Sequence, residues 1–330
     1  MRNTATQHLI IRSRRCAGKW GLPMFEQFNH PLVRDLVWVA LAPPLLTPGI
    51  LPVRDPLAGS VLRQDPEKLT HTLKQLETDP VELQRLVPES RDRRLGSYYE
   101  RLWHALLTLA PDVRMLGRNI TLYQHGITMG ELDLLLETPD GAVVHLELAI
   151  KFYVGQPEYA VAGKSFSPHS AWWGPDPRDQ MASKIDRLLN HQLSLASKLE
   201  LARERYPIPD LSCAWLQGQL FLPLDREMPP AVDSLAPATL NRWCRHAELN
   251  TLDGAEWIAL PHKQWLMPPP LIGTGPAGIA HLKEMARFSA IENRPLMLVR
   301  RDVPEIYDPL TTQRLLCMPD HWPGELPVTL

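Results

Sequence analysis

Residues 130–153, GELDLLLETPDGAVVHLELAIKFY, contain the pattern on which the fold of this chain depends. Their high content of Val, Leu and Ile predicts two strands, at 130–137 and 142–153. The intervening residues 138–141, TPDG, form a turn sequence, because proline presets one backbone angle and Asp-Gly tolerates positive φ. This stretch therefore predicts a β-hairpin.

Charged residues interrupt the apolar hairpin at positions that share faces of the strands. Successive side chains of a strand point to opposite faces, so Glu131 and Asp133 share one face of the first strand. His145, Glu147 and Lys151 share one face of the second strand, whose other face is wholly apolar and is expected to be core. Carboxylates on such strands are costly to bury unless they pair with cations or hold a metal.

An acid on one strand, followed by Glu and Lys on the next, resembles the PD-(D/E)XK nuclease superfamily. More narrowly, the chain resembles the bacterial DUF1853 family over most of its length after Phe25. The segments that carry this resemblance are RLGSYYERLW, GELDLLLE, HLELAIKFY, WWGPDPRD, KIDRLLNHQL and CMPDHWP. The resemblance implies an α/β fold with a nuclease-like core, in which helices flank a mixed central sheet, with additional N-terminal helices and a C-terminal α+β extension.

The resemblance also implies metal-dependent hydrolysis of phosphodiester bonds in nucleic acid, either DNA or RNA. In the superfamily an Asp and a Glu hold a divalent metal, which here would be Mg²⁺ or Mn²⁺ on Asp133 and Glu147. These cations prefer hard oxygen ligands. An acid from the helix before the sheet often joins them in the superfamily, and Glu100 is the residue at that place. A solvated helix flank is the alternative interpretation of Glu100.

The superfamily lysine stands two residues after the glutamate, and here that position is Ala149. Lys151 lies on the same face, roughly 7 Å further along the strand, and Lys184 follows on a later helix. Two functions therefore stay open, an active nuclease or a catalytically inactive nuclease-fold module that binds nucleic acid or a protein partner. A purely structural interpretation is also open, in which Glu147 pairs with Lys151.

Helices are predicted on both sides of the hairpin. Apolar residues repeat at helical spacing over 95–110, and Asp176 before a proline predicts a second helix from there to about 199. Side chains of the second helix, together with Glu131, are expected to support the metal ligands, with a solvated or structural role as the alternative. They are Gln180, Lys184, His191 and Gln192. Between hairpin and helix, the pair Trp172-Trp173 predicts either a lid or a plug of core.

The order of predicted elements organises the chain around one α/β core. After residue 90 it is α, β, β, β, α, β, which gives a mixed sheet covered by helices on both faces. We expect a flexible basic extension at 1–23, helices at 24–90, the core at 91–225 and an extension packed on it at 226–330. Further elements are expected as strands at 118–124, 212–222, 257–260, 296–299 and 315–318 and a helix at 279–288.

The composition and motifs of the chain limit the classes of partner and of chemistry that we expect. The net charge of −2 gives no global signature of nucleic-acid binding, so a local patch is needed. Candidates for such a basic rim are Arg94, Arg101, Arg118 and Lys164. No run of about 18 apolar residues exists, so no membrane span is expected. P-loop, GxSxG and HExxH patterns are absent, which leaves NTP-driven, acyl-transfer and zincin chemistry without support.

The cysteines indicate a reducing compartment. Cys16, Cys213, Cys244 and Cys317 are scattered without the CxxC or CxxH spacing of a zinc site. We therefore expect free thiols and a cytoplasmic location.

Overall fold

The computed structural model describes residues 27–159, 168–195, 197, 205–225, 240–251, 257–269, 276–300 and 313–324. The predicted extension at 1–23, Cys16 and Lys164 lie outside these described residues. Among the described helices, none combines the length and apolar character needed to cross a bilayer.

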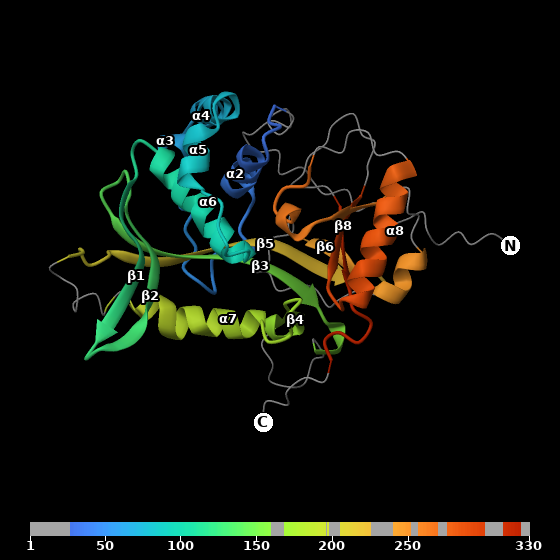
Figure 1. The fold of residues 1–330 in the computed structure, drawn as a ribbon. Helices are drawn as coiled ribbons and strands as arrows, with labels where there is room; N and C mark the ends of the chain where they lie inside the picture. Colours follow the sequence, from blue (N-terminus) through green and yellow to red (C-terminus); the bar gives the residue numbers. More distant parts are fainter. Residues whose placement is uncertain are drawn as a thin grey trace.

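A mixed sheet organises the described residues, and nine strands belong to it there (Figure 1). Its order is β1-β2-β3-β5-β6-β9-β8-β7, and β4 pairs with β3 off this path. The strands are β1 (Arg114–Gln124), β2 (Ile127–Glu137), β3 (Val143–Gly155), β4 (Trp172–Trp173), β5 (Leu211–Pro223), β6 (Leu240–Arg245), β7 (Trp257–Leu260), β8 (Leu296–Arg300) and β9 (Arg314–Met318).

Helices precede and interleave the strands. They are α2 (Pro31–Leu41), α3 (Val61–Gln64), α4 (Pro66–Thr78), α5 (Val81–Leu86), α6 (Leu95–Leu109), α7 (Met181–Arg187) and α8 (Pro276–Ile291). Local chemistry explains where several of them begin. The Asp65 carboxylate, for example, accepts hydrogen bonds from the first backbone N–H groups of α4. At its far end α7 continues into a wider π-helical turn, η3 (Leu188–Gln192).

The predicted central hairpin is confirmed. β2 and β3 are antiparallel, and their connecting turn contains Gly141 at a φ of 81°. Val144, Leu146 and Leu148 are buried in one apolar cluster with α6, as the alternation of β3 requires. The first strand also forms, although it begins at Arg114 rather than at residue 118.

Helices cover both faces of the sheet at β3 and β5. Trp103 of α6 packs in the same cluster as Leu146 of β3. On the other face, Ile185 of α7 packs with Tyr153 of β3 and Leu216 of β5. Figure 1 shows α6 above these strands and α7 below them. A mixed sheet with helices on both faces is therefore the architecture of this part of the chain.

The C-terminal strands continue the same sheet. β6 pairs in parallel with both β5 and β9, and β8 and β7 follow in antiparallel pairs. α8 contacts β7 and β8 and places Leu282 in the cluster with Leu298. The predicted elements at 257–260, 279–288, 296–299 and 315–318 are confirmed. β6 was not predicted, because its sequence LNRWCR lacks β-branched residues.

Between β3 and α7, the predicted start of the helix is wrong, and one of the two interpretations of the Trp pair is confirmed. The helix begins at Met181, not after Asp176, because the carbonyl of Asp176 accepts from the N–H of Asp179 and closes a turn there. The Trp pair is core rather than lid. Trp172 and Trp173 are buried, and β4 pairs them with the end of β3.

Two adjacent buried polar residues of α2 fix this helix to its neighbours. The guanidinium of Arg34 donates to the carbonyls of Phe28 at 2.9 Å and Pro268 at 2.8 Å. The adjacent Asp35 accepts from the Tyr98 hydroxyl at 2.6 Å. Burial raises the pKa of Asp35 to about 7.

The raised pKa of Asp35 predicts a pH-dependent stability. Folded Asp35 keeps its proton at pH values where unfolded Asp35 has lost it, so its contribution falls as pH rises from about 4 to about 7. Between about pH 5 and about pH 8, wild type should lose about 2 kcal/mol of unfolding free energy relative to Asp35→Asn. Urea titrations of both proteins at the two pH values measure this. An unchanged difference would contradict a buried, protonated Asp35.

Candidate metal centre

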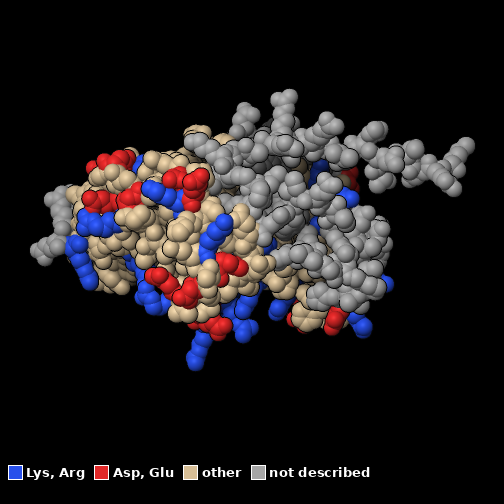
Figure 2. Space-filling view, turned by 90° about the horizontal axis from the view of Figure 1, so that it is seen from above, with Lys and Arg blue, Asp and Glu red and all other residues tan. Residues whose placement is uncertain are grey.

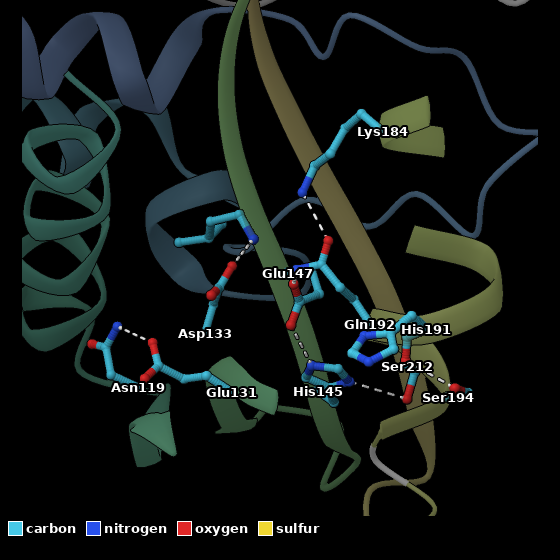
Figure 3. A network of polar contacts seen from close by, with 11 residues as sticks. Asn119, Glu131, Asp133, His145, Glu147, Lys184, His191, Gln192, Ser194 and Ser212 are labelled. Carbon is cyan, nitrogen blue, oxygen red and sulfur yellow. Dashed lines mark hydrogen bonds and ion pairs between the residues drawn. The ribbon is translucent and has the colours of Figure 1, made fainter. Parts of the chain in front are cut away.

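The two predicted metal ligands lie where β2 and β3 separate. The antiparallel ladder runs from Glu137↔Val143 to Leu134↔Leu146, so Asp133 and Glu147 occupy the next opposed positions. There the ladder stops, and Oδ2 of Asp133 accepts from the backbone N–H of Leu148 at 2.8 Å (Figure 3). A side chain has therefore taken the place of a backbone partner at the point where the pairing of β2 and β3 ends.

Burial and neighbouring charges perturb the Asp133 carboxyl. The pKa of Asp133 is raised to about 8, first by burial and next by the negative charge of Glu147. Glu100 on α6 raises it further, whereas the N–H of Leu148 and the charge of Lys184 lower it. A cation near the two carboxylates would offset the repulsion that contributes to this raised pKa.

Glu147 is fully buried and held at both oxygens. Oε1 lies 2.9 Å from Nε2 of His145, and Oε2 accepts from the Gln192 amide. Nδ1 of His145 lies 3.3 Å from the Ser212 hydroxyl. If Nε2 carries the proton and donates to Glu147, Nδ1 accepts from Ser212, so each polar atom of the imidazole has a partner. Figure 3 shows this row of side chains along β3.

The two candidate lysines, Lys151 and Lys184, have different hydrogen-bond partners. Nζ of Lys151 donates to Asp179 at 2.6 Å, so the alternative interpretation in which Glu147 pairs with Lys151 is wrong. Lys151 therefore contacts the turn that precedes α7. Nζ of Lys184 donates to Oε1 of Gln192 at 2.9 Å, and the same amide binds Glu147.

The Lys184 amine therefore interacts electrostatically with both carboxylates. Burial lowers the pKa of Lys184, while the charges of Glu147 and Asp133 raise it. The two contacts of Gln192 supply the partners that its amide needs in the middle of an apolar helix stripe. The wider π-helical turn η3 contains Gln192, so the turn places the amide between the lysine and Glu147.

Glu100 and Glu131 act on the site through charge. Burial and the charges of Glu131 and Glu147 raise the pKa of the half-buried Glu100. Glu131 is exposed and accepts from Asn119 and Thr121, both at 3.3 Å. Glu100 therefore adds negative potential at Asp133, and Glu131 adds negative potential at Glu100.

The remaining predicted residues lie on the α7 side. His191 is exposed, and its Cε1 lies 3.5 Å from where a Cβ on Gly130 would be. Gln180 precedes the first residue of α7, and its backbone carbonyl accepts from the N–H of Lys184 at 3.0 Å. Gln180 therefore supports the lysine through the backbone of the helix start.

Two functional contacts were missed by sequence reasoning. His145 was placed on the face of Glu147, and the spacing H-x-E on a strand is the signal that links them. Ser212 carried no such signal. Its contact depends on the parallel register of β3 and β5, in which His145 pairs with Ser212.

The comparisons place the chain in a family. Residues 34–312 match the family described as Domain of unknown function (DUF1853). The chain belongs to the DUF1853 family. The DUF1853 match spans every element that carries the candidate metal centre, from α6 to β5. No curated protein and no solved structure matches the chain.

Two residues of this DUF1853 chain carry the kind of oxygen donor that suits a hard divalent cation. Asp133 and Glu147 offer carboxylate oxygens, the type of ligand that Mg²⁺ and Mn²⁺ prefer. Within the described ranges, no group of three or more His, Cys, Asp and Glu side chains could hold a metal ion. A cation here would therefore rest on two carboxylates and take its other ligands from substrate and water, as Mg²⁺ commonly does.

Proposed function

We propose that this DUF1853 chain is a metal-dependent nuclease that hydrolyses phosphodiester bonds, with Mg²⁺ or Mn²⁺ held by Asp133 and Glu147. One observation carries the proposal. The two carboxylates stand opposite each other where β2 and β3 separate, and the Lys184 amine is linked to Glu147 through Gln192. Glu100 is the proposed further acid, because its charge acts on Asp133 from the α6 side.

The order of elements supports the proposal. α6, β1, β2, β3, α7 and β5 follow the order predicted for the nuclease-like core, and β5 runs parallel to β3. In the proposed site, Glu100 comes from α6, Asp133 and Glu147 from the strands, and Lys184 from α7.

Each residue has a chemical task in the proposed reaction. When bound, the metal ion supplies positive charge at the phosphate and lowers the pKa of a neighbouring water. His145 and Gln192 hold the Glu147 carboxylate in one orientation, in which it would serve as a ligand of the ion. Lys184 offers its ammonium to the negative charge that develops on the phosphate, or orients the attacking water.

The proposed substrate is DNA or RNA. It would bind to a local group of basic residues, because the chain as a whole carries no excess of positive charge. Figure 2 shows acidic and basic side chains interspersed on the face that carries the N-terminal helices, so that face is no continuous basic surface. Of the predicted rim, Arg94 is engaged by Asp92 at 2.9 Å. Arg118 is exposed and approaches His104, with no ion pair to a described residue, which leaves its charge available to a phosphate.

Cleavage assays on two lysine variants test the proposal. Wild type should cut single- or double-stranded DNA or RNA in the presence of Mn²⁺. Lys184→Met should lower the cleavage rate by about 100-fold or more, because one transition-state charge partner is lost. Lys151→Met is the matched control and should stay within about threefold of wild type, since Lys151 pairs with Asp179 instead. Equal activity of wild type and Lys184→Met would overturn the assigned role.

Ala149 supports the second candidate function, an inactive module that binds nucleic acid or a protein partner. The motif lysine is absent from β3, and Lys184 comes from a different element. If wild type cleaves none of the four nucleic acids with Mn²⁺ or Mg²⁺, the nuclease proposal fails. Saturable binding of one of them would then favour the module.

Gln192→Leu should weaken metal binding by about tenfold or more, because partners of metal ligands commonly contribute that much. The substitution frees Oε2 of Glu147 and removes the acceptor of Lys184. Asn190→Leu removes another amide from the same helical segment, one that bonds to Asp186, and should leave affinity unchanged. Calorimetric Mn²⁺ titrations of the three proteins measure the difference. Equal affinity in the Gln192 variant would contradict the bridging role.

A further inference from the structure

A cavity of about 620 Å³ opens between α2, the first half of α6 and the segment 262–269. None of the proposed metal ligands lines it. Part of its wall is apolar, formed by Pro31, Leu32, Leu95 and Met267. The rest of the wall is mainly polar or charged, and a volume of this size is typical of small-molecule sites.

Two of the acids that line the cavity are already engaged. Asp35 accepts from the Tyr98 hydroxyl, and its raised pKa shows that burial favours its neutral form. Asp92 accepts from both the backbone and the guanidinium of Arg94. These acids therefore offer little attraction to a cationic ligand.

Arg34 on the cavity wall donates to backbone carbonyls, but three other cations of the wall have no such partner. Arg93, Arg101 and Lys263 form no ion pair and no hydrogen bond with another described residue. Nε of Arg101 is shielded from solvent and lacks an acceptor, while its guanidinium lies 5.9 Å from the Tyr98 ring centroid. The exposed Glu89 is the opposing carboxylate on the wall. Positive charge thus gathers here in a chain whose net charge is −2.

The cationic groups of Arg93, Arg101 and Lys263 lack acidic partners among the described residues, and an anion bound in the cavity would supply charged acceptors. We propose that this cavity binds a small organic anion. Its apolar or aromatic body lies on Leu32 and Leu95, and its phosphate or carboxylate lies among Arg93, Arg101 and Lys263. The site is separate from the carboxylate pair, so the proposal does not depend on nuclease activity.

Binding of the fluorescent anion 8-anilinonaphthalene-1-sulfonate to the full chain tests this proposal. Wild type should show saturable binding with one site. Arg93→Met/Arg101→Met should weaken it by about tenfold or more, because charged hydrogen-bond partners of the sulfonate are removed. Leu32→Trp should also weaken it, because the larger side chain fills the cavity. Arg85→Met/Lys74→Met, two basic residues that do not line the cavity, is the matched control and should bind as wild type does.

Competition with phenyl phosphate and phenylacetate then identifies the head group. Displacement by one of them assigns a phosphate or a carboxylate ligand, and displacement by neither overturns the proposal. Unsaturable binding to wild type, or equal affinity in the arginine and control variants, overturns it as well. Thermal unfolding of each variant establishes that it is folded. If Leu32→Trp does not fold, the arginine pair still decides the outcome, because its members do not lie in the apolar core.

Discussion

Gly218→Ala is expected to prevent folding or to lower the unfolding free energy by more than about 4 kcal/mol. Gly218 lies in β5 directly beside Lys151 of β3, at a φ of 141°. A Cβ there would lie 1.7 Å from the carbonyl oxygen of Lys151 and 2.7 Å from its carbonyl carbon. Backbone atoms cannot rotate away as a side chain can, so β3 and β5 would have to separate.

Gly141→Ala is the control that separates the clash from backbone strain. Gly141 also has positive φ, at 81°, but a Cβ there would have no atom within 4 Å. Its substitution should cost only about 1–2 kcal/mol. Urea unfolding of both variants, or their soluble yield, measures the contrast. Similar losses in the two proteins would contradict the close contact of β3 and β5.

Gln217→Leu is expected to lower the unfolding free energy by about 3–5 kcal/mol, because several buried polar groups lose their partner. Gln217 is 0 % exposed. Its Oε1 accepts from the Tyr99 hydroxyl at 2.8 Å and the Trp103 indole at 3.3 Å. Its Nε2 donates to the carbonyls of Val39 at 3.0 Å and Ala42 at 2.5 Å. One amide thus joins β5 to α6 and to the end of α2.

Gln84→Leu is the matched control, because Gln84 is exposed on α5. It should change the unfolding free energy by no more than about 0.5 kcal/mol. Urea titrations of both variants give the comparison. A loss below about 1 kcal/mol in Gln217→Leu would show that the four contacts do not connect the layers as described.

The parts of the fold that depend on local pattern were predictable from sequence. Alternation along 143–150 and the Asp-Gly turn predict the hairpin, and the turn glycine has the positive φ expected of it. The same alternation brings Asp133 opposite Glu147, because a strand pair joined by a short turn has one register. The acids of the candidate site are therefore recognisable from the amino-acid sequence alone.

The supporting contacts depend on long-range register and could not be predicted in this way. Ser212 reaches His145 only because β5 runs beside β3, which no local pattern specifies. Lys184 meets Gln192 because the helix widens at η3, and a regular 3.6-residue period does not anticipate that turn. Asp179, the partner of Lys151, belongs to a turn where the sequence predicts the start of a helix.

Mn²⁺ binding measured by calorimetry tests the central claim most directly. The proteins are wild type, Asp133→Asn/Glu147→Gln and the control Glu137→Gln, which changes a β2 carboxylate that pairs with Arg114 instead. We predict binding to wild type and the control, and a loss of about 100-fold or more in the double variant, since both proposed ligands are removed. Absence of Mn²⁺ binding to wild type, or equal affinity in the double variant, would contradict the assignment of Asp133 and Glu147 as a metal centre.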